Sequence, residues 1–177
     1  PDSLDPGGLT AAQYHDNPRL AGNGADQFDA RKTLRHVQFG LIYRHNFNQN
    51  NSIRLLVYDV DHSVLQYLPF SGNFGASGGG VVDLERKSGG IGGRFTHRDE
   101  IAGIPITAIA GVDFGYEDQH RKGYVNNNGS IGGLRRNEQD IARNIAEYAQ
   151  IDANLTSRII FDAGVRHSQE YFSVQDL

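Results

Sequence analysis

The sequence predicts an all-β protein built as an antiparallel, up-and-down sheet. Three observations predict it. Apolar and polar residues alternate over long stretches, which is typical of half-buried strands. Clusters of Asn, Gly and Asp separate these stretches and indicate turns. The chain has 22 glycines but only 5 prolines, a ratio that favours strands with glycine-rich bends over helices.

Composition excludes several other classes of protein. The chain has 177 residues and a net charge of −4, which argues against a nucleic-acid-binding protein with its usual basic face. An aromatic content of 10% is too high for a disordered acidic tail. The apolar residues never run unbroken for the ~18 positions of a transmembrane helix. Because cysteine is absent, disulfides, thiolate zinc sites and cysteine nucleophiles are excluded.

The alternation predicts six strands. The clearest signals are Val37, Phe39, Leu41 and Tyr43 on one face of the first strand, and a longer series that begins at Ile104. Alternation is blurred around Asp59, where we expect a β-bulge. Residues 137–148 are also compatible with a short helix, but a strand that begins near Asn144 is favoured. The expected strands are 35–47, 52–67, 84–97, 104–117, 144–154 and 158–172.

The connections between these strands alternate in length. Tight turns are expected near Asn50, Asp99 and Thr156, and long polar loops at 70–80 and 117–140. The first thirty residues are also expected to form loop. Each strand is long enough to cross a bilayer when tilted, which needs ~9–11 residues. Short turns at one end and long loops at the other are typical of outer-membrane barrels.

The two faces of the strands differ in a way that fits a membrane barrel. One face is almost purely aliphatic or phenylalanine, with Tyr43 and Tyr116 as candidates for an interfacial girdle. The other face suits a polar lumen, and its charged residues are Arg44, Arg94, Asp113, Glu117, Asp152, Asp162 and Arg166. The pattern therefore favours a transmembrane, up-and-down β-barrel. A soluble or secreted β-rich ligand-binding module, either a sandwich or a lipocalin-like barrel, remains the alternative.

No motif in the sequence indicates an enzyme, and we predict neither catalytic nor metal-binding residues. The seven histidines form no H-E-x-x-H pattern, and no G-x-S-x-G nucleophile motif is present. The glycines at 89–93 are not followed by the Lys-Ser/Thr of a phosphate-binding loop, and Asp59 and Asp61 are interpreted as solvated carboxylates. No cofactor is expected.

Candidate ligand-binding residues lie in the predicted loop 117–140. Arg135, Arg136 and Tyr124 combine fixed positive charge with an aromatic ring, and Arg121 and Lys122 lie nearby. Arginine and tyrosine together can bind anionic, oxygen-rich ligands through charge-assisted hydrogen bonds and stacking. The alternative is that these residues are solvated loop charges that balance the acidic residues Glu117, Asp118, Glu138 and Asp140.

Several segments resemble TonB-dependent outer-membrane receptors for iron–siderophore complexes. Residues 5–13, 17–19 and 28–32 resemble an extracellular loop and the strand that descends from it. Residues 90–97 resemble a strand that ends at a periplasmic turn. Residues 133–138 and 147–150 resemble a long loop that re-enters the barrel, and residues 163–168 resemble the following strand.

The resemblance implies an internal segment of a receptor barrel, about six strands of a larger barrel, with the plug domain and the C-terminal strands absent from residues 1–177. It implies a location in the outer membrane of a Gram-negative bacterium. The implied partners are an iron–siderophore ligand, outer-membrane lipid and, through the missing N-terminal parts, the TonB–ExbB–ExbD system; no nucleic acid is expected. Whether the ligand is an iron chelate, haem or cobalamin stays open.

Overall fold

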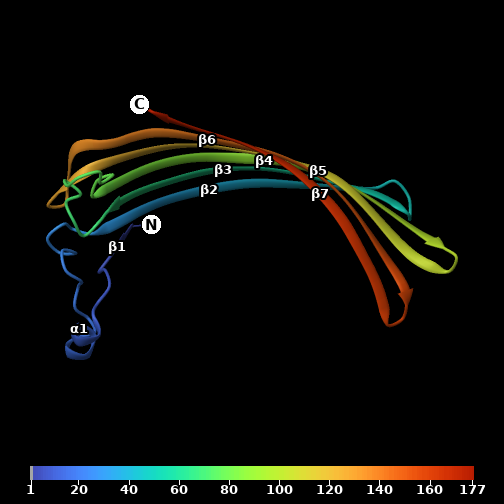
Figure 1. The fold of residues 1–177 in the computed structure, drawn as a ribbon, viewed down its shortest axis with the longest axis horizontal. Coiled ribbons are helices and arrows are strands. Elements are labelled where there is room, and N and C mark those ends of the chain that lie inside the picture. The colour runs from blue at the N-terminus through green and yellow to red at the C-terminus, as the bar shows by residue number, and fades with distance from the viewer. Residues whose placement is uncertain (1) are drawn as a thin grey trace.

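A computed structural model describes residues 2–177 as one antiparallel sheet. Its seven strands lie in chain order, so that each strand pairs with the next (Figure 1). A single short helix lies between the first two strands. The elements are β1 (Asp2–Leu4), α1 (Ala11–Asp16), β2 (Arg31–Asn46), β3 (Asn51–Tyr67), β4 (Val81–Ile101), β5 (Ile104–Asn127), β6 (Ser130–Thr156) and β7 (Ile159–Asp176). The predicted all-β, up-and-down class is confirmed.

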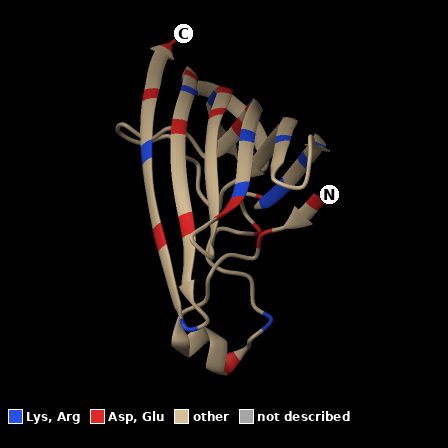
Figure 2. Cartoon of the chain, turned by 90° about the vertical axis from the view of Figure 1, so that its right-hand side faces the viewer, with Lys and Arg blue, Asp and Glu red and all other residues tan. Residues whose placement is uncertain are grey.

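The sheet is one curved layer without a second layer packed on it in the described part of the chain (Figures 1 and 2). Its fully buried side chains are few, and Val81 and Asn126 are the largest of them, at 0% and 1% exposure. Large apolar side chains such as Phe39, Leu41 and Val165 are about 70% exposed. Because most apolar surface is uncovered, the sheet does not bury a hydrophobic core of the ordinary two-layer kind.

The largest correction to the predicted strands concerns residues 117–140, which are not a loop. β5 continues to Asn127 and β6 begins at Ser130, so the two strands have 24 and 27 residues. The connection is a two-residue turn in which Asn128 and Gly129 have φ values of 49° and 88°. Asn-Gly is the preferred pair for a type I′ hairpin, because both residues tolerate positive φ. The many polar residues that suggested a loop instead line two long strands.

Two smaller corrections concern β3 and β4. β4 runs through Asp99 to Ile101, and the chain turns at Ala102 and Gly103, both with positive φ. The expected bulge near Asp59 is absent, because β3 keeps one register with both of its neighbours there. The alternation is blurred for a different reason. Tyr58 lies over Gly90 on β4, where a Cβ atom would come within 2.6 Å of the Tyr58 ring.

The N-terminal segment contains more regular structure than the expected loop. β1 pairs with the start of β2. The helix α1 starts with a capping box, in which the Thr10 hydroxyl accepts from the Gln13 amide and the Gln13 side chain accepts from the Thr10 amide. No helix within residues 2–177 has the length and apolar character needed to cross a membrane.

The connections gather at two opposite ends of the sheet (Figure 1). We call the end with the β2–β3, β4–β5 and β6–β7 turns the turn end. The opposite end carries residues 5–30, residues 68–80 and the β5–β6 turn, and we call it the loop end. As predicted, the turns near Asn50 and Thr156 lie at the same end.

Candidate functional site

The two faces of the sheet carry different side chains, as their alternation predicts. We call them the apolar face and the polar face. In the central part of the sheet the apolar face exposes Phe39, Leu41, Leu55, Val57, Ile91, Phe95, Val112, Phe114, Ile145, Ile151, Phe161 and Val165. The seven charged residues assigned to the other face all lie on the polar face. In Figure 2, which views the sheet from the turn end, the charged residues are spread along the strands.

Residues that lie directly opposite each other on successive strands form a row across the sheet. The apolar residues form a band that crosses these rows diagonally. The row that contains Leu41 on β2 passes through apolar residues on four strands and ends at Gln169 on β7. Conversely, the row that contains Val165 on β7 ends at His45 on β2. The band therefore moves toward the turn end from β2 to β7. A sheet that closes into a barrel has strands tilted by about 35–45° and staggered in this sense.

Tyrosines mark one border of this band. Tyr116 and Tyr171 flank Arg143 in one row of the apolar face, next to the apolar residues Phe114 and Ile145. The Arg143 guanidinium lies 5.8 Å from the centre of the Tyr116 ring. Tyr116 is in the middle of β5, so the aromatic residues mark the end of the band and not the end of the strand.

On the polar face, hydrogen-bonded side chains lie over glycines of the neighbouring strands. Arg166 pairs with Asp113 at 3.6 Å, and the Gln150 amide donates to Asp152 at 2.8 Å and to Asp162 at 3.0 Å. Glycines on β4 and β5 make room for large neighbours; Tyr148, for example, occupies the space of a Cβ at Gly111. A hollow of about 480 Å³ opens beside them, and its lining includes Tyr58, Ser88, Gly115, Glu117, Asn144 and Glu170.

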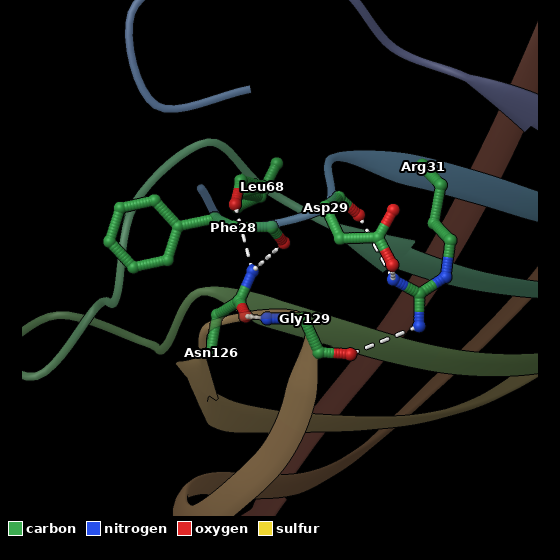
Figure 3. Close-up of polar contacts among 6 residues, drawn as sticks. All are labelled: Phe28, Asp29, Arg31, Leu68, Asn126 and Gly129. Carbon is green, nitrogen blue, oxygen red and sulfur yellow. Dashed lines mark hydrogen bonds and ion pairs between the residues drawn. The ribbon is translucent and has the colours of Figure 1, made fainter. Parts of the chain in front are cut away.

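At the loop end, six residues from three distant segments join in one polar network, which we call the loop-end cluster: Phe28, Asp29, Arg31, Leu68, Asn126 and Gly129 (Figure 3). Asn126 is its centre. Its side-chain amide donates to the carbonyls of Phe28 at 2.9 Å and Leu68 at 3.0 Å, and its oxygen accepts from the Gly129 amide at 2.8 Å. At 1% exposure, every polar atom of this side chain is satisfied inside the protein.

Arg31 extends the cluster to the start of β2. Its guanidinium pairs with the Asp29 carboxylate and donates to the Gly129 carbonyl at 3.1 Å. It also lies over the Tyr67 ring, 3.6 Å from the ring centre, in cation–π geometry. The β5–β6 turn is thus held against the segments that precede β2 and follow β3.

The predicted ligand-binding residues lie on strands at the loop end and not in a flexible loop. The Arg136 guanidinium pairs with Glu138 at 2.7 Å, and the Glu138 side chain is 8% exposed. Arg135 donates to the Gly75 carbonyl at 2.7 Å. Tyr124 lies on β5, and its backbone carbonyl accepts from the Gly80 amide at 2.8 Å. No hydrogen bond or ion pair joins these three side chains to each other in the described structure, and their role in ligand binding stays a prediction.

Sequence reasoning missed the residues that organise this end of the sheet. Asn126 was part of a run of three asparagines that indicated only a loop, and Arg31 had no motif. One usable signal was present, because Asn128-Gly129 between two alternating segments is a strong short-range mark of a hairpin. The contacts of Asn126 with Phe28 and Leu68 had no such signal, since their partners are 98 and 58 residues away.

The described residues do not bring three His, Asp or Glu side chains together in a way that could hold a metal ion. One pair of such side chains is His36 and His62 on the polar face, whose Nδ1 atoms are 3.2 Å apart. Their neighbour in the same row is Arg86, a cation that disfavours binding of a further positive charge.

The fold has known counterparts, although no family model matches the sequence. The ferric-catecholate import receptor Fiu from E. coli K12, in its open form, aligns with a TM-score of 0.63 and 18% sequence identity. The closed form of the same receptor aligns with a TM-score of 0.62 and 18% identity. Each alignment covers 83% of this chain, but 27% and 25% of the respective receptor chain.

The chain thus spans about a quarter of the length of the receptor structures that it matches. At this level of identity the likeness concerns the fold alone. The seven-stranded, up-and-down sheet therefore has the fold of about a quarter of these receptor chains.

Proposed function

We propose that residues 1–177 form a section of the wall of a TonB-dependent outer-membrane receptor that imports a ferric siderophore or a similar iron chelate. The apolar band is the observation that carries this proposal. It extends over six strands, although Glu147 interrupts it on β6, it is exposed, and it crosses the strands at a slant. A lipid-facing wall requires these three properties together, since barrel strands tilt against the membrane normal.

The polar face supports the same arrangement. A receptor barrel of this size has a plugged lumen, and polar and charged residues that satisfy each other, such as Arg166 and Asp113, suit such an interior. A soluble sandwich is less well supported, because its apolar face would need a second sheet to cover it. The soluble ligand-binding module is therefore the alternative that the first experiment tests.

The first experiment is fractionation of cells that express the full-length protein. We expect it to sediment with outer membranes, to resist extraction with urea and to dissolve only in detergent. Replacing Leu41 on the apolar band with arginine should prevent stable insertion, because a charged side chain costs about 2–4 kcal/mol near the bilayer midplane. Gln38→Arg, three residues away on the polar face, is the matched control. A full-length protein found in the soluble fraction would contradict the proposal.

Iron import is tested separately from membrane location. Deletion of the gene should reduce uptake of radiolabelled iron supplied as ferric chelates, and the panel should include catecholate, hydroxamate and citrate chelates, with haem and cobalamin as alternatives. If the deletion reduces uptake of none of these ligands, the protein has another function in the outer membrane. The TonB–ExbB–ExbD dependence follows from the same proposal, and dissipation of the proton gradient should abolish uptake.

Arg135, Arg136 and Tyr124 remain our proposed ligand contacts at the loop end. Since Arg136 neutralises the buried carboxylate of Glu138, a change of Arg136 alone would also disturb the fold. The informative variants are therefore Arg135→Gln and the double variant Arg136→Gln with Glu138→Gln, with Tyr124→Phe as the conservative change. Loss of a charge-assisted contact should weaken binding by about tenfold or more. If ligand affinity is unchanged in both arginine variants, the role of these residues is to stabilise the segment of residues 68–80.

A further inference from the structure

On β6, the apolar face carries one charged residue within the apolar band, and this residue is Glu147. Its neighbours along the strand on the same face are Ile145 and Ala149, and the residue opposite it on β5 is Val112. The border of the band on β6 is at Arg143, which lies between two tyrosines in its row. Glu147 is four residues further toward the turn end, about 13 Å along the strand. The carboxylate therefore lies among the apolar residues of the band and not at its border.

Glu147 has one titratable neighbour, His167, which lies directly opposite it on β7. Both strands that flank β6 are described, and among the residues next to Glu147 on this face the only other polar one is Gln169. No ion pair joins Glu147 to another described residue, and Glu147 and His167 are both exposed. A charge on a lipid-facing strand destabilises the inserted barrel, and ionisable residues at membrane depth mark functional sites.

An apolar hollow adjoins this pair on the side of the turn end. Its volume is about 340 Å³, and four of its six lining residues have their side chains on the apolar face: Ala149, Ile151, Ala163 and Val165. The hollow begins in the next row of this face, where Ala149 is directly opposite Val165. An apolar centre with a polar group at its edge is the usual composition of a protein–protein contact. In membranes, small residues allow close approach of two proteins, and polar side chains form hydrogen bonds between them.

We propose that this surface, from Glu147 and His167 to the hollow, is the interface with a second copy of the full-length protein in the membrane. The pair is self-complementary, because a carboxylate accepts hydrogen bonds and an imidazole donates one in each protonation state. A two-fold axis along the membrane normal, passing between the two side chains, brings Glu147 of each copy against the partner's His167. Such an isologous interface makes every contact twice, so one pair on each copy gives two intermolecular hydrogen bonds.

A lipid headgroup fits this surface less well than a second copy does. Headgroups lie at the level of the aromatic border, which is marked here by Tyr116 and Tyr171 beside Arg143. Glu147 lies deeper, among acyl chains that offer it no hydrogen-bond donor. A second copy supplies the donor at the required depth, because rotation about the membrane normal leaves every residue at its own height. This inference rests on the proposed function in one respect, namely that the apolar face meets lipid.

Mixed pairs of charge variants test the intermolecular contact. Full-length copies with two different tags are expressed together, and dimers are measured by co-purification in mild detergent. Glu147→Lys removes the carboxylate from the interface, and His167→Glu places carboxylate against carboxylate. Each variant alone should therefore dimerise at least tenfold more weakly than the wild type. Expressed together, the two variants should recover the dimer, because Lys and His of one copy then face the two carboxylates of the other.

This recovery distinguishes an intermolecular contact from a pair that acts within one chain, which a second copy cannot restore. Leu55→Lys, in the same row on β3, is the matched control and should leave dimerisation unchanged. If both charge variants reach the outer membrane but do not recover the dimer together, the proposal is wrong.

Photo-cross-linking tests the same surface without a change of charge. A benzophenone amino acid at Ile151, in the hollow, should give a product of twice the mass that joins two peptides from residues 1–177. The same probe at Leu41, on β2, should give no such product. Absence of the product at Ile151, or a cross-link there to lipid alone or to another protein, would overturn the proposal. Fractionation of the same samples reports separately on membrane location, so failure of this inference does not imply failure of the proposed function.

Discussion

The two ends of the sheet are built in different ways. At the turn end, most side-chain hydrogen bonds of the turns join residues of the same connection, although the Arg98 amide at the end of β4 also donates to the Asn50 carbonyl at 2.8 Å. The Asn48 side-chain oxygen Oδ1 accepts from the backbone amides of Asn50 at 2.9 Å and Asn51 at 2.7 Å. The Thr156 hydroxyl accepts from the amides of Arg158 at 3.2 Å and Ile159 at 3.0 Å. These side-chain partners are two or three residues apart.

At the loop end, the connections stabilise each other. The Asn126 side chain joins segments 98 and 58 residues away, and the Asn126 amide donates to the Ser71 carbonyl at 2.8 Å. The effect of a substitution at the turn end should therefore stay close to the changed turn, whereas a substitution at the loop end should disturb all three segments. The loop end is therefore a preorganised surface, which suits a role in holding ligand-contacting residues.

The largest effect that separates the two ends is expected from Asn126→Ala. The variant leaves the carbonyls of Phe28 and Leu68 and the amide of Gly129 without partners in a buried site, at a cost of about 1–3 kcal/mol for each unsatisfied group that water does not reach. Hydrogen exchange should increase together in residues 22–30, 68–80 and 124–132. Asn127→Ala, at the exposed neighbouring position, is the control. Faster exchange confined to the β5–β6 turn would show that the three segments are independent.

A smaller effect is expected from a matched pair of glycines, one at each end. Gly103 and Gly129 both occupy the second position of a two-residue turn, with φ values of 79° and 88°. A Cβ at Gly103 would meet nothing within 4 Å, but at Gly129 it would lie 2.8 Å from the Asp29 Cβ. Gly103→Ala should cost about 1 kcal/mol from positive φ alone, and Gly129→Ala should cost more because Asp29 must move.

Thermal unfolding of the full-length protein measures both glycine variants, and exchange of residues 22–30 locates the difference. If the two substitutions have the same cost, the contact between Gly129 and Asp29 does not contribute to stability. That result would weaken the description of the loop end as one unit.

The smallest effect is expected from Asn48→Ala at the turn end. The turn is exposed, so water can replace the lost hydrogen bonds, and the cost should be no more than about 1 kcal/mol. Exchange should increase only at residues 47–51 and at Arg98, whose amide donates to the Asn50 carbonyl, with the β4–β5 and β6–β7 turns unchanged. A simultaneous change in the other two turns would contradict the local character of this end.

The strands and their faces could be predicted because side-chain direction in a strand alternates with a period of two. The series from Ile104 to Tyr116 and the lumen-type charges such as Asp113 and Arg166 were assigned to the correct faces by this rule. The interpretation of residues 117–140 failed because glycine, asparagine and charged residues were taken as loop formers. Gly123 on β5, for example, instead leaves room for the Gly78 carbonyl and for the Arg136 side chain, which a Cβ at this position would meet.

The alternation along the chain was enough to locate the central part of six strands and to assign their faces, since both depend on neighbours along the chain. It did not reveal that β5 and β6 extend over residues 117–140, nor which residues lie opposite each other, because both depend on pairing between strands. The register places Arg44, Arg54 and Arg94 in one row, and loop packing brings Phe28 and Leu68 to Asn126. These contacts join residues far apart in the chain, so no local pattern encodes them. Register is set by the pairing of whole strands, and it appears only when the sheet has formed.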